Sequence, residues 1–157
     1  MITNHHSHTK KPLHILLVED NEGDILLTIE ALEEENLIFT IVVVKDGWEA
    51  IQFLNNKGKY INERLPDLIM MDINLPKMNG IEVLKNIKSN ESLQHIPISI
   101  LTTSSSPEDI KICLQHKANF FLTKPLDTKV FVKKLLSLKD FKNATWRYLP
   151  VVNEKSI

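Results

Sequence analysis

Residues 66–80, PDLIMMDINLPKMNG, give the clearest indication of how this chain folds. Four apolar residues at 68–71 lead directly into an aspartate, Asp72, and Asn, Pro and Gly residues soon afterwards break the run. The apolar residues are typical of a buried strand, whereas an ionised carboxylate without a partner is costly to bury. Asp72 is therefore either an acidic turn residue or part of a functional site.

Four further apolar runs recur along the chain, and each is nearly continuous rather than alternating between apolar and polar residues. Continuous runs are typical of parallel strands that are covered on both faces. The runs begin about one βαβ unit apart, which favours a helix between successive strands. With 66–76 as the third strand, the other expected strands are 14–20 (HILLVED), 39–47 (FTIVVVKDG), 96–104 (IPISILTTS) and 119–125 (NFFLTKP).

The segments between and after these runs carry apolar residues at helical spacing. Pro107, preceded by Ser105 and Ser106, indicates where the fourth helix begins. The alternation predicts an α/β fold: a (βα)5 flavodoxin-like, doubly wound parallel sheet with strand order 2-1-3-4-5. The apolar positions expected on the five helices are Ile25, Ile29 and Leu32; Ala50, Phe53 and Leu54; Ile81, Leu84 and Ile87; Ile110, Cys113 and Leu114; and Phe131, Leu135 and Leu138.

The composition of the chain excludes several classes of protein. Its 157 residues, 43% hydrophobic and 25% charged, fit one soluble globular domain. A formal charge of -1 argues against a nucleic-acid partner, and no apolar run approaches the ~18 residues that span a membrane. The single cysteine, Cys113, excludes an internal disulfide and suits a cytoplasmic location.

Three regions are expected along the chain. Residues 1–12 are polar and lack the apolar segment of a signal peptide, so they are predicted to be a disordered leader. Residues 13–139 contain all the expected strands and helices and form the folded domain. Residues 140–157 contain Trp146 and Tyr148 and are too apolar for a free tail. We expect this extension to pack on the domain or on another subunit.

Polar residues follow the strands at the edge of the sheet where ligands bind in doubly wound folds, near the reversal of strand order. Glu19 and Asp20 end the first expected strand, Asp72 the third, Thr102 the fourth and Lys124 the fifth. Each residue alone is also common in a turn or a helix cap. Their occurrence at one edge of the sheet favours a functional site.

Clustered carboxylates at this edge favour a bound cation. Neighbouring carboxylates repel one another and raise each other's pKa, and a divalent cation cancels the repulsion. Oxygen ligands without His or Cys favour Mg²⁺ over zinc. We expect Asp20 and Asp72 as ligands, a backbone carbonyl near Asn74 as a third ligand, and Glu19 acting through a water molecule.

This arrangement suits phosphoryl transfer. A carboxylate at a strand end can attack phosphorus and form an acyl phosphate, and Asp72 is the expected nucleophile because it is central in the sheet. Lys124 and the Thr102 hydroxyl would then share the charge of the phosphoryl oxygens with the metal.

Four motifs in residues 13–138 resemble the receiver domain of two-component response regulators. VEDN carries the acidic pair Glu19–Asp20, and MMDINLPKMNG resembles the phosphoacceptor segment of the family. LTTS supplies the hydroxyl residue, and FLTKP supplies a lysine before a proline that is cis in the family. The resemblance implies that Asp72 accepts the phosphoryl group and that Asn74 provides the carbonyl ligand.

The resemblance also implies a switch. Phosphorylation draws Thr102 toward the phosphoryl group and lets Phe121 turn inward, which remodels the face formed by the fourth helix, the fifth strand and the fifth helix. Phe121 lacks the hydroxyl of the tyrosine often found there. Its two rotamers would therefore differ in packing alone, without a hydroxyl hydrogen bond. Thr103 stands where a small residue is common and would narrow access to the acyl phosphate.

Within the family, VEDNEGDILLTIEAL, LPKMNG and the W…LP tail resemble stand-alone receivers paired with bacterial phytochromes. This implies a sensor histidine kinase as phosphodonor, a homodimer through the switch face and the C-terminal extension, and a further protein as downstream partner. It implies a signalling domain rather than an enzyme, one that catalyses at most its own phosphorylation and slow dephosphorylation.

Two alternatives remain open from the residues. One is a receiver-like interaction module that works without phosphorylation. The other is an aspartate-nucleophile phosphohydrolase of the haloacid dehalogenase type. Those enzymes carry a second acid two residues after the nucleophile, where this chain has Asn74.

Overall fold

The computed structural model describes residues 12–35, 37–103 and 106–138. The predicted C-terminal extension, with Trp146 and Tyr148, lies outside these residues, as does the predicted leader apart from residue 12. Within the described residues, none of the helices has the length and apolar character needed to cross a bilayer.

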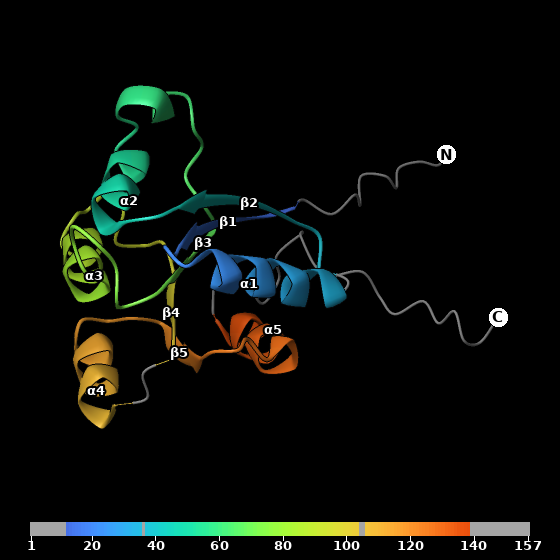
Figure 1. Ribbon diagram of the computed structural model, residues 1–157. Helices are drawn as coiled ribbons and strands as arrows, with labels where there is room; N and C mark the ends of the chain where they lie inside the picture. Colours follow the sequence, from blue (N-terminus) through green and yellow to red (C-terminus); the bar gives the residue numbers. More distant parts are fainter. Residues whose placement is uncertain (1–11, 36, 104–105, 139–157) are drawn as a thin grey trace, which may run out of the picture.

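Within the described residues, five parallel strands form one sheet in the order β2-β1-β3-β4-β5, which confirms the predicted fold and strand order (Figure 1). Five α-helices and a short 3₁₀ helix lie between or after the strands in this part of the chain. In chain order the elements are β1 (Leu13–Val18), α1 (Glu22–Glu34), β2 (Phe39–Val44), α2 (Gly47–Leu54), η2 (Gly58–Tyr60), β3 (Leu68–Met71), α3 (Gly80–Lys88), β4 (Ile98–Thr102), α4 (Pro107–Gln115), β5 (Phe120–Thr123) and α5 (Thr128–Ser137).

The helices cover both faces of the sheet. In Figure 1, α1 and α5 lie together on one side, while α2, α3 and α4 lie on the other. Alternate residues of the central strands feed the two resulting cores: Leu16 and Val18 pack toward α2 and α3, and Ile15 and Leu17 pack toward α1 and α5. Both faces of β1 and β3 are therefore buried, which explains their uninterrupted apolar sequences.

The apolar pattern located the helices correctly, with two local differences. Leu114 lies on the outer side of α4 and is 51% exposed, while Cys113 beside it is fully buried. Leu138 follows α5 as its C-cap rather than lying within it. At the start of α4, Ser106 is the N-cap and Pro107 occupies the first turn, as predicted.

Each strand is shorter than the apolar run that predicted it. The last residue of β1 is Val18 and the last of β3 is Met71, so Glu19 and Asp72 are the first residues beyond their strands. Their backbone N–H groups still bond to the neighbouring strands, Glu19 to the Val44 carbonyl at 3.0 Å and Asp72 to the Val18 carbonyl at 3.1 Å. The ladder thus fixes the backbone of both acids.

The loop between Asp72 and α3 is tightly folded. The Ile73 carbonyl accepts hydrogen bonds from the Leu75 N–H at 3.0 Å and the Gly80 N–H at 2.7 Å. A Cβ at Gly80 would lie 2.3 Å from the Asp72 carbonyl oxygen, so only glycine lets α3 begin against this loop. Asn79 caps the helix with a reciprocal capping box to Glu82.

We predict that Gly80→Ala lowers the free energy of unfolding by about 1–3 kcal/mol, because the added methyl group collides with backbone rather than with a movable side chain. Gly23→Ala is the matched control. Gly23 lies in α1, is exposed, and its Cβ would meet only the Asn21 side chain at 3.3 Å. The control should be neutral or stabilising in urea unfolding. Equal stability of the two variants would contradict the close packing at Gly80.

Candidate functional site

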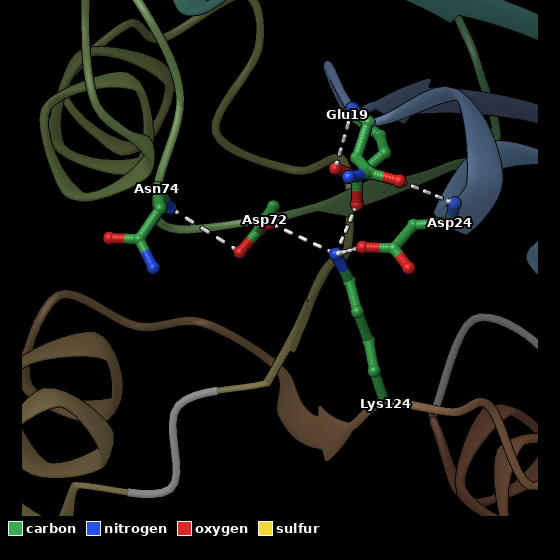
Figure 2. Close-up of polar contacts among 6 residues, drawn as sticks. Glu19, Asp24, Asp72, Asn74 and Lys124 are labelled. Atoms are coloured by element: carbon green, nitrogen blue, oxygen red, sulfur yellow. Dashed lines mark hydrogen bonds and ion pairs between the residues drawn. The ribbon is translucent and has the colours of Figure 1, made fainter.

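The polar residues expected to converge come from the carboxyl ends of β1, β3 and β5. Figure 2 shows Lys124, which follows β5, extending toward Glu19 and Asp72, with Asn74 in the adjacent loop. Because parallel strands end at the same edge of the sheet, residues 105 positions apart in the chain come into contact. The structure therefore brings Glu19, Asp72 and Lys124 together as the sequence predicted.

The ammonium group of Lys124 is the centre of this cluster. Its Nζ donates hydrogen bonds to Glu19 Oε1, to Asp24 Oδ2 at 2.9 Å and to Asp72 Oδ2 at 3.0 Å. The Lys124 side chain is only 7% exposed. Burial by itself would lower the pKa of Lys124, but the hydrogen bonds to the three carboxylates outweigh burial and raise it. The lysine is thus charged at neutral pH, and its three N–H groups are all engaged.

Glu19 is the most deeply buried of the three acids, with a side chain 2% exposed. Burial raises the pKa of Glu19, and the hydrogen bonds from Lys124 and from the Asn21 N–H, at 3.2 Å, oppose this rise. The backbone and the lysine together make burial of this carboxylate tolerable.

Asp72 lies at the floor of the site, with its side chain 10% exposed. Its Oδ2 accepts from Lys124, and its Oδ1 accepts from the Asn74 N–H at 3.3 Å. The carboxylate that follows the buried strand therefore has a cationic partner and a backbone donor. The acid that follows the apolar strand is thus part of a polar cluster, unlike an isolated acidic turn residue.

The remaining predicted residues differ in their exposure. Asp20 is exposed next to Glu19, and the Asn74 side chain is exposed beside Asp72. Thr102 ends β4 and is fully buried, and Phe121 in β5 is partly buried against the core. Thr103 is exposed and helps to line a cavity of about 280 Å³ together with Leu27 of α1, Pro125 and neighbouring residues. The Lys124–Pro125 peptide bond is cis, as the resemblance implied.

The donor atoms suit a hard cation. Among the described residues, no three His, Cys, Asp or Glu side chains are grouped to hold a metal ion as they stand. Mg²⁺ does not need such a cage, since it keeps several waters and takes one or two carboxylates. The edge of the sheet supplies carboxylate oxygens from Asp72 and Glu19, and among the described residues none of the side chains paired with Lys124 is a cysteine or a histidine. The roles of Asp20 and of the Asn74 carbonyl as ligands stay predictions.

Asp24 was missed by reasoning from the sequence. It lies in the first turn of α1, where an acidic residue ordinarily stabilises the helix N-terminus, and the sequence alone gives no reason to connect it to Lys124. Its N–H is held by the Asn21 cap at 2.9 Å, which fixes the turn that directs its carboxylate to the site.

Comparison with known proteins agrees with this geometry. The family described as "Response regulator receiver domain" matches residues 15–136, and the chain belongs to this family. Response regulator Rcp1 of Synechocystis sp. is 38% identical over 130 residues, which cover 83% of this chain and 88% of the relative.

Two solved structures are also similar. The phosphorylated cyanobacterial phytochrome response regulator RcpA has 40% identity and a TM-score of 0.71, covering 79% of this chain and 89% of that one. The Mn²⁺-bound form of Rcp1 has 36% identity and a TM-score of 0.71, covering 87% and 99%. Relatives of this chain thus include phytochrome response regulators, and one of them has been solved with a divalent metal ion.

We predict that Lys124→Met lowers the free energy of unfolding by about 2–4 kcal/mol at pH 7, because it leaves buried carboxylates without their cation. The loss should shrink at pH 5. The pKa of Glu19, already raised by burial, rises further without Lys124, so the folded variant gains stability by taking up protons as the pH falls.

Lys45→Met provides the control in the same urea titrations. Lys45 also pairs with an acid of α1, Glu22, but both side chains are mostly exposed. Its loss should change stability far less and with little dependence on pH. Equal effects of the two substitutions would show that the Lys124 cluster contributes no more than a surface ion pair.

Proposed function

We propose that this chain is a stand-alone response regulator in which Asp72 accepts a phosphoryl group from a sensor histidine kinase in the presence of Mg²⁺. The contact between Lys124 Nζ and Asp72 Oδ2 carries the proposal, because it places a charged donor beside a carboxylate at the ligand-binding edge of the sheet. Membership of the receiver family supports the same conclusion.

In this proposal Asp20, Asp72 and the Asn74 carbonyl would hold the metal, with Glu19 acting through water. A metal ion held there would supply positive charge to offset that of the carboxylates and the phosphoryl oxygens. A carboxylate oxygen of Asp72 attacks phosphorus, the bond to the donor histidine nitrogen breaks, and that histidine takes up a proton as it leaves. Lys124 and the Thr102 hydroxyl receive the phosphoryl oxygens, and Thr103 at the rim limits access of water to the acyl phosphate.

The phosphodonor we propose is a histidine kinase of the phytochrome type, acting in the cytoplasm. The support is the naming of the similar proteins, which include a phytochrome response regulator and Rcp1. The chain itself would catalyse only its own phosphorylation and slow dephosphorylation.

We further propose that the α4–β5–α5 face carries the output, first to a second copy of the chain and then to a downstream protein. A groove on this face is lined by Leu114, Phe121 and Val130, and Leu114 is half exposed. The Lys134 ammonium donates to the Phe121 carbonyl at 3.3 Å, which links α5 to the strand that carries the switch residue. Movement of Thr102 and Phe121 would reshape this groove.

Incubation with Mg²⁺ and acetyl phosphate tests the central claim. We expect the intact mass to increase by one phosphoryl group in the native protein and to stay unchanged in Asp72→Asn, because the amide is a poor nucleophile. An unmodified native protein, tested with a phosphorylated histidine kinase as well, would favour the interaction module. Sustained release of phosphate from many esters would favour the phosphohydrolase.

Size-exclusion chromatography with the phosphoryl mimic beryllofluoride tests the output face. We expect the mimic to shift the native protein toward a dimer and to leave Leu114→Glu monomeric, because a charge in the groove opposes apolar pairing. The native protein and Leu114→Glu should bind the mimic equally. A dimer that persists in Leu114→Glu would place the interface elsewhere.

A further inference from the structure

Asp24 differs from the other two acids that contact Lys124, because it comes from a helix and lies nearest to solvent. Its side chain is 31% exposed, against 10% for Asp72 and 2% for Glu19. Figure 2 shows its carboxylate beside the ammonium group of Lys124, on the side of α1. It also lines the small cavity that opens next to Lys124 and Thr103.

The contact at 2.9 Å makes Asp24 a competitor for the lysine. Asp24 and Asp72 accept from the same nitrogen, so the two carboxylates are neighbours across a single ammonium group. A phosphoryl group on Asp72 requires the same ammonium as its counter-ion. Every N–H of Lys124 that stays with Asp24 is withheld from the phosphoryl oxygens.

The negative charge of Asp24 also disfavours a phosphoryl group on Asp72. Glu19, Asp24 and Asp72 place three carboxylates in contact with one lysine, and Asp20 follows Glu19 in the chain. A phosphoryl group adds negative charge at the open side of the site, where Asp24 is the most exposed of the acids in contact with Lys124. The Asp24 carboxylate would repel a neighbouring phosphoryl group on Asp72, whereas it would attract a divalent cation bound at the site.

We infer that Asp24 is a positioning residue that holds Lys124 in the resting state, weakening the affinity of the site for a phosphoryl group and strengthening its affinity for Mg²⁺. The inference rests on the proposed function of Asp72. Competition and repulsion both oppose the phosphoryl group, so the two effects add. Asp24 thereby sets how readily the resting protein passes to the phosphorylated state.

Binding of beryllofluoride at saturating Mg²⁺, followed by backbone amide NMR, tests the inference in the 157-residue chain. We expect Asp24→Asn to bind the mimic about threefold to tenfold more tightly than the native protein. Binding of Mg²⁺ alone, measured by calorimetry, should weaken by about twofold to fivefold in the same variant. A loss of helix stability cannot produce these opposite changes.

Glu22→Gln is the matched control. It removes the same charge from the same turn of α1, but Glu22 pairs with Lys45 and not with Lys124. We expect its affinities for both ligands to stay within twofold of the native values. Asn retains the shape of Asp24 in the first variant, and Gln that of Glu22 in the second. Thermal unfolding of both variants verifies that each is folded.

The outcomes separate the inference from the proposed function. If the native protein binds the mimic and Asp24→Asn binds it equally or more weakly, the role of Asp24 is overturned while that of Asp72 stands. Equal tightening in Glu22→Gln would also overturn it, because bulk charge would then account for the effect. If the native protein fails to bind the mimic at all, the result contradicts the proposed function, and the inference about Asp24 is contradicted with it.

Discussion

The ammonium group of Lys124 makes it possible for three carboxylates to share the edge of this sheet. Glu19 and Asp72 are almost fully buried, and burying a carboxylate without a partner is costly. The lysine, itself 7% exposed, gains in turn from three acceptors that offset the loss of its hydration. The ion cluster therefore connects the ends of β1, β3 and β5 to the first turn of α1.

The parallel sheet creates this cluster because all five strands end at one edge. The backbone ladder continues through the first residue beyond β1 and β3, which fixes Glu19 and Asp72 before their side chains make any contact. The tight loop that ends at Gly80 then places the Asn74 N–H against Asp72. Fold and site thus follow from the same constraint on where the strands stop.

The sequence predicted the parts of the site that follow from strand ends. Glu19, Asp72 and Lys124 each come after an apolar run, so the strand order alone brings them together. The expected strands ran too long because their bounds included polar residues beyond the last strand residue, such as Glu19 and Asp20 after Val18. Asp24 escaped prediction because its role depends on the reach of Lys124 across the site, and an acid in a first helical turn has an ordinary explanation. Contacts between a loop lysine and a helix have no signature in one sequence.

Under the proposed function, one cation that serves several anions would couple the resting and phosphorylated states. In the structure Lys124 offsets the repulsion among Glu19, Asp24 and Asp72. A phosphoryl group on Asp72 would need that same charge, so whatever stabilises the present cluster would count against the phosphorylated form. A divalent cation bound at these carboxylates would supply further positive charge. The proposed need for a metal then follows from an excess of carboxylates over ammonium groups, and the number of acids around the lysine would determine how strong that need is.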